Sequence, residues 1–174
     1  MENLKYSDDN DRSYGAAGMA IGLVVYDGED MLASITLDGD PNDMVSMSPD
    51  FYFAGNPGVS AKTAWNQILK NYNLGIAMVM SNLLCRNLVM KRTGLSDDLR
   101  DTLHSLAVEE GHTSCSLDDD EIDRLFDKNL NYLTRVFSHH GVQSVAHDFA
   151  STLLSRRSLS RLDVIEQLAS LRML

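Results

Sequence analysis

The stretch from Leu74 to Met90, LGIAMVMSNLLCRNLVM, decides the fold. Written as a helix, it is apolar on nearly all sides and leaves a narrow polar stripe that contains Asn71, Asn82 and Arg86. A helix that is apolar all round is buried on most sides. Two arrangements meet this requirement: the helix is central to a bundle, or its outer face, including Met78, is a subunit interface. Both can hold, and we expect a homodimer in which residues 74–90 contribute to the contact.

Two residues of this stretch constrain the structure around them. Arg86 requires a carboxylate or several carbonyl groups, because an unpaired buried charge is strongly destabilising. Gly75 costs about 1 kcal/mol relative to Ala inside a helix. We therefore expect a kink or a close helix crossing at Gly75.

Helix signals continue on both sides of this stretch. The first helix begins after Ser60, a plausible N-cap, and apolar residues recur at helical spacing from Trp65 to Leu83. Gly94 suits the left-handed residue that closes it, and Gly111 is expected to close the next. Capping residues and glycines together predict five helices, at about 60–92, 96–111, 118–141, 142–157 and 160–174.

The N-terminal third has a different pattern. Residues 19–26 and 31–37 are expected to be two strands of a β-hairpin around the turn cluster 27–30. Gly15, Gly18 and Gly22 lack the strand-then-helix context of a phosphate loop. The predicted fold is mainly α (α+β), an N-terminal β-hairpin followed by a bundle of about five α-helices around a central apolar helix. Residues 1–14 are expected to be a mobile acidic leader, and residues 15–174 one globular domain, with hairpin and loop over 15–59 and the helical bundle over 60–174.

An aromatic triplet, Phe51-Tyr52-Phe53, lies between Pro49 and Pro57. In an extended segment Phe51 and Phe53 face one side and Tyr52 the other. We expect the two phenylalanines to anchor this loop on the helices while Tyr52 stays near solvent at a shallow pocket, as a candidate contact for a ligand or partner. The alternative is that the whole triplet seals the core.

Composition restricts the classes of partner. The 174 residues include 15 basic and 25 acidic side chains, for a net charge of −10. Such a surface disfavours nucleic acid and anionic membranes. The apolar run over 15–26 is well short of the roughly 20 residues that span a bilayer. With no visible signal peptide and only Cys85 and Cys115 as cysteines, we expect a cytoplasmic protein without a cofactor.

The histidines suggest one alternative. The pair His147-Asp148 resembles that of metal-dependent phosphohydrolases of the HD type, over these two residues only. With His139 and His140 it could supply metal ligands. However, the helix period places His147 and Asp148 on opposite flanks, facing water. We expect His140 instead to cap the C-terminal end of its helix.

Two function classes therefore remain. The first is a non-enzymatic interaction or scaffold protein, which self-associates or binds a protein partner through the Met-rich helix and the aromatic loop. Its candidate binding residues are Phe51, Tyr52, Phe53, Met78 and Arg86. The alternative is a small metal-dependent hydrolase that uses His139, His140, His147 and Asp148. The first is the prediction, because no catalytic pattern has the spacing that its chemistry requires.

Overall fold

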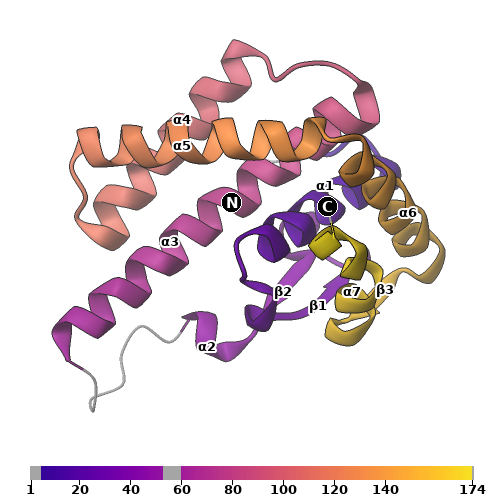
Figure 1. The fold of residues 1–174 in the computed structure, drawn as a ribbon, viewed down its shortest axis with the longest axis horizontal. Coiled ribbons are helices and arrows are strands. Elements are labelled where there is room, and N and C mark those ends of the chain that lie inside the picture. The colour runs from indigo at the N-terminus through magenta and orange to yellow at the C-terminus, as the bar shows by residue number, and fades with distance from the viewer. Residues whose placement is uncertain (1–4, 53–59, 174) are drawn as a thin grey trace.

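The protein is mainly α-helical, as predicted, in the computed structural model, which describes residues 5–52 and 60–173 (Figure 1). The α-helices are α1 (Asp9–Val25), α2 (Pro49–Tyr52), α3 (Ala61–Leu84), α4 (Asp97–Glu110), α5 (Asp119–Ser138), α6 (His140–Arg156) and α7 (Arg161–Gln167). Two π-helical segments continue α3 and α4, namely η3 (Cys85–Lys91) and η4 (Gly111–Cys115). Three short 3₁₀ turns complete the helical elements, namely η1 (Glu29–Met31), η2 (Pro41–Asp43) and η5 (Ala169–Met173).

The predicted helix starts are confirmed at four caps. Ser60 and Ser96 accept backbone hydrogen bonds from Thr63 and Leu99. Asp118 and Ser160 form complete capping boxes with Glu121 and Asp163, in which each side chain accepts the other residue's amide. These local contacts set where α3, α4, α5 and α7 begin.

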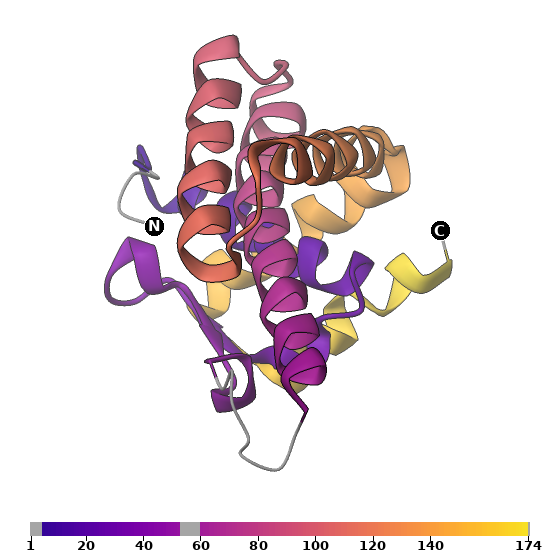
Figure 2. The same cartoon turned by 90° about the vertical axis from the view of Figure 1, so that its left-hand side faces the viewer.

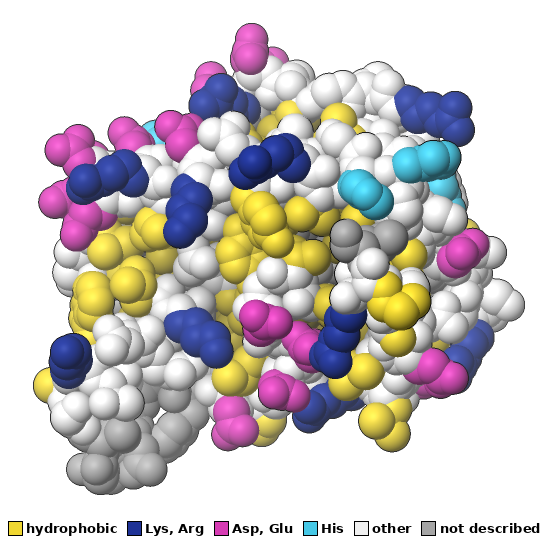
Figure 3. Space-filling view, in the orientation of Figure 1, with side chains coloured by type: hydrophobic (Ala, Val, Ile, Leu, Met, Phe, Trp, Pro, Cys, Tyr) yellow, Lys and Arg dark blue, Asp and Glu magenta, His cyan; other side chains and the backbone are white. Residues whose placement is uncertain are grey.

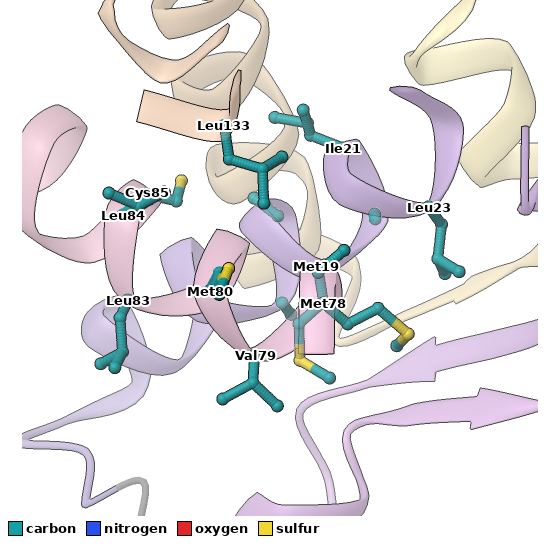
Figure 4. Packing of buried hydrophobic residues seen from close by; sticks show 14 of the residues in the cluster. Met19, Ile21, Leu23, Met78, Val79, Met80, Leu83, Leu84, Cys85 and Leu133 are labelled. Carbon is teal, nitrogen blue, oxygen red and sulfur yellow. The ribbon is translucent and has the colours of Figure 1, made fainter. Parts of the chain in front are cut away.

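The apolar helix is central to the fold. Figure 2 shows α3 flanked by α4 and α5, while α1 packs on it more extensively than any other element. Its buried side chains meet those of α1 in the core (Figure 4). The face of the molecule shown in Figure 3 carries charged side chains around apolar areas. Residues 61–91 form one helix long and apolar enough to cross a membrane, yet 72% of its most apolar window is buried by protein. This burial is the pattern of a core helix in a soluble protein.

The N-terminal strand expected over 19–26 is wrong, because this segment belongs to α1. The helix begins at Asp9, capped by Asp8, so residues 9–14 of the expected leader are helical. Asp11 and Ser13 are buried there. Alanine and glycine make up six of the eight residues 15–22 in α1, and most sides of the helix are covered, so it lacks the amphipathic period that marks a surface helix.

The glycines of α1 allow a close helix crossing. A Cβ at Gly18 would lie 2.2 Å from the backbone oxygen of Ser81 on α3, and one at Gly22 would lie 2.5 Å from the Ser81 Oγ. Gly75 has no neighbouring atom within 4 Å of such a Cβ. The close crossing expected at Gly75 is therefore wrong, and it occurs instead at Gly18 and Gly22.

The sheet is small and antiparallel, with strand order β2-β1-β3. β1 (Leu32–Thr36) is the predicted strand over 31–37, but its hairpin partner is β2 (Val45–Met47), in the segment expected as loop. β3 (Ser158–Ser160) comes from the C-terminal region and pairs with the other edge of β1. The sheet thereby joins the N-terminal region of the chain to its C-terminal region (Figure 1).

Two helices end differently from the prediction. The left-handed residue after η3 is Arg92 (φ 54°), not Gly94. Gly111 is helical, and the chain turns at Ser116 (φ 51°) after η4. Gly111 is needed for packing, because a Cβ there would lie 2.8 Å from Ile122.

Candidate functional site

The aromatic segment divides into an anchored ring and an exposed ring. Phe51 is half-buried and packs against the core, and its carbonyl accepts a 2.6 Å hydrogen bond from Asn71 Nδ2 on α3. Tyr52 is 71% exposed, and its ring meets that of Phe51 edge to face at 5.4 Å. This is the expected division between the two side chains. The extended backbone is wrong, since Pro49–Tyr52 is a helical turn, and Phe53 lies outside the described residues.

This placement predicts unequal costs for two truncations. Phe51→Ala is expected to lower the free energy of unfolding by about 2 kcal/mol, less than a fully buried phenylalanine, because the ring is half-buried. Tyr52→Ala is expected to cost less than about 0.5 kcal/mol. Urea denaturation of both variants measures the difference. Equal losses would show that Tyr52 belongs to the core and would remove it from the candidate surface.

The helical spacing of apolar residues from Trp65 to Leu83 predicts that Trp65 faces the core. Trp65 is instead 46% exposed. At 100° per residue, it lies within an arc of about 140° on the α3 surface. We call this arc the α3 face, and its residues are Lys62, Trp65, Asn66, Leu69 and Lys70. All are exposed except Leu69, which is half-buried. The first turns of α3 extend past the other helices at this end of the molecule (Figure 1), and Lys62, Trp65, Asn66 and Lys70 are exposed there.

Tyr52 and the α3 face belong to the same end of the molecule. The hydrogen bond from Asn71 to Phe51 fixes α2 against α3. Asn71 lies about 100° further round the helix than Lys70, outside the arc of the α3 face, so Tyr52 and Trp65 lie on different sides of α3. Trp65 lies six residues from Asn71, about 9 Å along the helix axis. Tryptophan and tyrosine bury large areas at little entropic cost, which makes them frequent anchors of protein interfaces.

Arg86 pairs with a buried carboxylate, that of Asp11, as its burial requires. Its Nε and Nη2 donate to the two carboxylate oxygens of Asp11 at 2.6 Å each, and Nη2 also donates to the Lys5 carbonyl at 2.7 Å. The Tyr6 ring lies 4.5 Å from the guanidinium carbon. Arg86 is 5% exposed and Asp11 is 1% exposed. Arg86 therefore holds the N-terminal segment on the central helix, and its role as a ligand contact stays a prediction.

The ion pair changes the titration of Asp11. Burial alone would raise the pKa of this carboxyl, but hydrogen bonds from Arg86 and from the Ser7 amide outweigh it and lower the pKa below 3.8. A lowered pKa in the folded state means that the charged carboxylate stabilises the fold above about pH 4, and that this contribution is lost as the pH falls through the folded-state value.

Asp11→Asn is expected to remove this part of the acid sensitivity. The difference in free energy of unfolding between wild type and Asp11→Asn should be constant from about pH 7 to pH 5 and shrink below about pH 4, where the unfolded carboxyl begins to bind protons. Urea denaturation at a series of pH values measures it. A difference that stays unchanged down to about pH 2 would contradict the lowered pKa.

The structure does not support an interface at the Met-rich stretch. Met78 is 3% exposed, and within residues 74–90 only Gly75, Leu88 and Met90 are more than slightly accessible. The interior arrangement accounts for the apolar surface, so Met78 is corrected from a contact residue to a core residue. Self-association stays a prediction, without a contact at Met78.

The four candidate metal ligands are not brought together. Within residues 5–52 and 60–173, no group of three or more His, Cys, Asp or Glu side chains is placed to hold a metal ion. His139 is the N-cap of α6, where its Nδ1 accepts from the Gly141 amide, and His140 is the first helical residue. The expectation that His140 caps the end of α5 is therefore wrong. His147 and Asp148 are exposed, as expected.

These observations leave two exposed side chains of the anchor type at this end of the molecule, Tyr52 on α2 and Trp65 on the α3 face. The chain was compared with protein-family models, with curated proteins and with solved structures, and none of them matches it.

Proposed function

We propose that this chain is a non-enzymatic interaction protein that binds an acidic segment of a partner protein through the α3 face, with Trp65 as the anchor. The observation that carries the proposal is the exposure of Trp65, at 46%, in a fold that buries most of the apolar side chains of α3. Large exposed apolar side chains are few among the described residues: Tyr52, Trp65, Tyr132, Leu162 and Met173. Two of them belong to this one end of the molecule.

The local charge supports an acidic partner. The chain has a net charge of −10, yet residues 61–71 contain Lys62 and Lys70 and no acidic residue. A local basic surface on an acidic protein attracts an acidic segment and repels a basic one. Aromatic anchors next to lysines favour a partner that combines apolar side chains with carboxylates.

A reducing compartment fits the cysteines. Cys85 and Cys115 are both buried and free, and burial raises the pKa of each thiol, so that neither is a reactive thiolate. The fold is held together by its core and has no need of a disulfide. We therefore place the proposed interaction in the cytoplasm.

The proposal is tested with a fluorescein-labelled amphipathic helix of glutamate and leucine, about 18 residues long, so that it is helical in solution. Fluorescence anisotropy should show saturable binding that weakens as salt is added, because charge contributes to it. The same peptide with lysine in place of glutamate should not bind. Trp65→Ala should weaken binding about 10-fold or more, as for an interface anchor.

Leu162→Ala is the matched control. Leu162 is 77% exposed on α7, away from the proposed surface, so its removal should leave the affinity unchanged. Equal loss of binding in Trp65→Ala and Leu162→Ala would show nonspecific adsorption and would overturn the proposal, as would equal binding of the two peptides. Light scattering of the free protein reports in parallel whether a second copy occupies the surface.

A further inference from the structure

A hollow lies where the end of η3 meets the corner between α5 and α6, far along α3 from Trp65. Its volume is about 680 Å³. Its walls come from two segments that are distant in the sequence: Leu88, Val89, Arg92, Thr93 and Gly94 on one side, and Ser138, His140, Gln143, Ser144 and His147 on the other. Figure 3 shows histidine side chains gathered at this corner of the surface.

The charge of this hollow is opposite to that of the whole chain. Arg92, His140 and His147 line it, and no aspartate or glutamate does, although the chain has 25 acidic residues. Within the described part of the chain, Arg92 has no carboxylate oxygen within 4 Å, so its guanidinium is not committed to a protein anion. Hydroxyl groups of Ser144 and Thr93 add neutral hydrogen-bond donors, whereas the Ser138 hydroxyl donates to the Thr134 carbonyl at 2.7 Å.

A contact with α1 holds the His147 side chain in place. The Tyr14 hydroxyl on α1 lies 2.6 Å from His147 Nδ1, and the two rings meet edge to face at 5.5 Å. Burial raises the pKa of Tyr14, so its hydroxyl keeps its proton and can donate to Nδ1. A neutral imidazole that accepts at Nδ1 carries its proton on Nε2. With Tyr14 as the donor, His147 presents an N–H donor on its other ring nitrogen.

Arg92 is placed at the rim by an unusual backbone. It adopts the left-handed conformation, with φ 54°, as the residue that ends η3. Few residues other than glycine take this conformation without a reason. The Thr93 amide donates to the Asn87 carbonyl at 2.9 Å and fixes the turn. The turn thus brings a guanidinium to the same hollow as the two histidines.

We propose that this hollow binds the phosphate group of a small phosphorylated molecule. An arginine fork matches the oxygens of a phosphate, and histidine and hydroxyl donors complete its coordination. The volume exceeds what a phosphate group fills, and Leu88 and Val89 offer an apolar wall for an attached organic group. A phosphate monoester fits this combination better than free phosphate. The site shares no lining residue with the α3 face, so the two proposals stand independently.

Isothermal titration calorimetry with phenyl phosphate, inorganic phosphate and benzoate separates the ligand classes. We expect phenyl phosphate to bind at millimolar concentration or below, inorganic phosphate more weakly, and benzoate not to bind. If inorganic phosphate binds as tightly as phenyl phosphate, the phosphate site stands and its ligand is free phosphate. Failure of both phosphates to bind, or equal binding of benzoate, overturns the proposal.

Substitutions in the hollow test whether phenyl phosphate binds there. Arg92→Ala and His147→Ala should each weaken binding of phenyl phosphate about 10-fold. Arg100→Ala is the matched control, because Arg100 is an exposed arginine paired with Asp127 between α4 and α5. Arg92 is exposed, so its removal should leave the urea midpoint unchanged and keep the test free of unfolding. Affinity that is unchanged in Arg92→Ala, or reduced equally in Arg100→Ala, contradicts the assigned site.

Discussion

Arg86→Met is expected to lower the free energy of unfolding by about 3–5 kcal/mol, because it leaves the Asp11 carboxylate buried without a counter-charge. Asp11 is 1% exposed and receives two hydrogen bonds of 2.6 Å from this guanidinium. The loss should also release the segment around Lys5 and Tyr6, which contacts the same side chain. Urea denaturation followed by circular dichroism measures the change.

The double variant Asp11→Leu with Arg86→Met separates charge from packing. Replacing both partners of a buried pair by apolar side chains often costs little, so the double variant should be more stable than Arg86→Met alone. Arg100→Ala, which breaks an exposed pair with Asp127, should cost less than about 1 kcal/mol. A loss below about 1 kcal/mol for Arg86→Met would show that the pair does not hold the N-terminal segment.

Gly18→Ala is expected to destabilise the protein by about 3 kcal/mol, the upper range for overpacking. The added Cβ would lie 2.2 Å from the Ser81 backbone oxygen, and a backbone atom in a central helix cannot move aside as a flexible side chain can. The two helices must separate to admit the methyl group, which disturbs the main contact of the core.

Gly75→Ala is the matched control for this variant. A Cβ at Gly75 meets nothing within 4 Å, so alanine should stabilise the protein by about 0.5–1 kcal/mol through its better helix propensity. Thermal unfolding of both variants gives the comparison. If the two alanines had the same sign of effect, the close crossing of α1 and α3 would be contradicted.

Local signals predicted the helices that local contacts determine. Ser60, Ser96, Asp118 and Ser160 each cap a helix through bonds spanning three residues, and such bonds are legible in a sequence. The helix α1 was missed because its glycines lower helix propensity, and its compensation is contact with Ser81, many residues away. β3 was not predicted either, because its three residues form a strand only by pairing with β1, which is distant in the sequence.

The candidate sites also depend partly on local sequence and partly on contacts between distant segments. The need of Arg86 for a carboxylate followed from the burial of its helix, but its partner Asp11 lay in a segment expected as a leader. The exposure of Trp65 depends on where α4 and α5 stop covering α3, which no periodicity reveals. The hollow lined by Arg92 and His147 forms only when α6 packs beside the end of η3.

The fluorescence of Trp65 tests the proposed interaction most directly, because it is the only tryptophan in the chain. Its emission reports on the α3 face alone. We predict that the acidic peptide shifts the emission to shorter wavelength and protects it from acrylamide, since binding removes water from an indole that is 46% exposed. Emission and quenching that stay unchanged at peptide concentrations saturating the anisotropy signal would contradict binding at the α3 face.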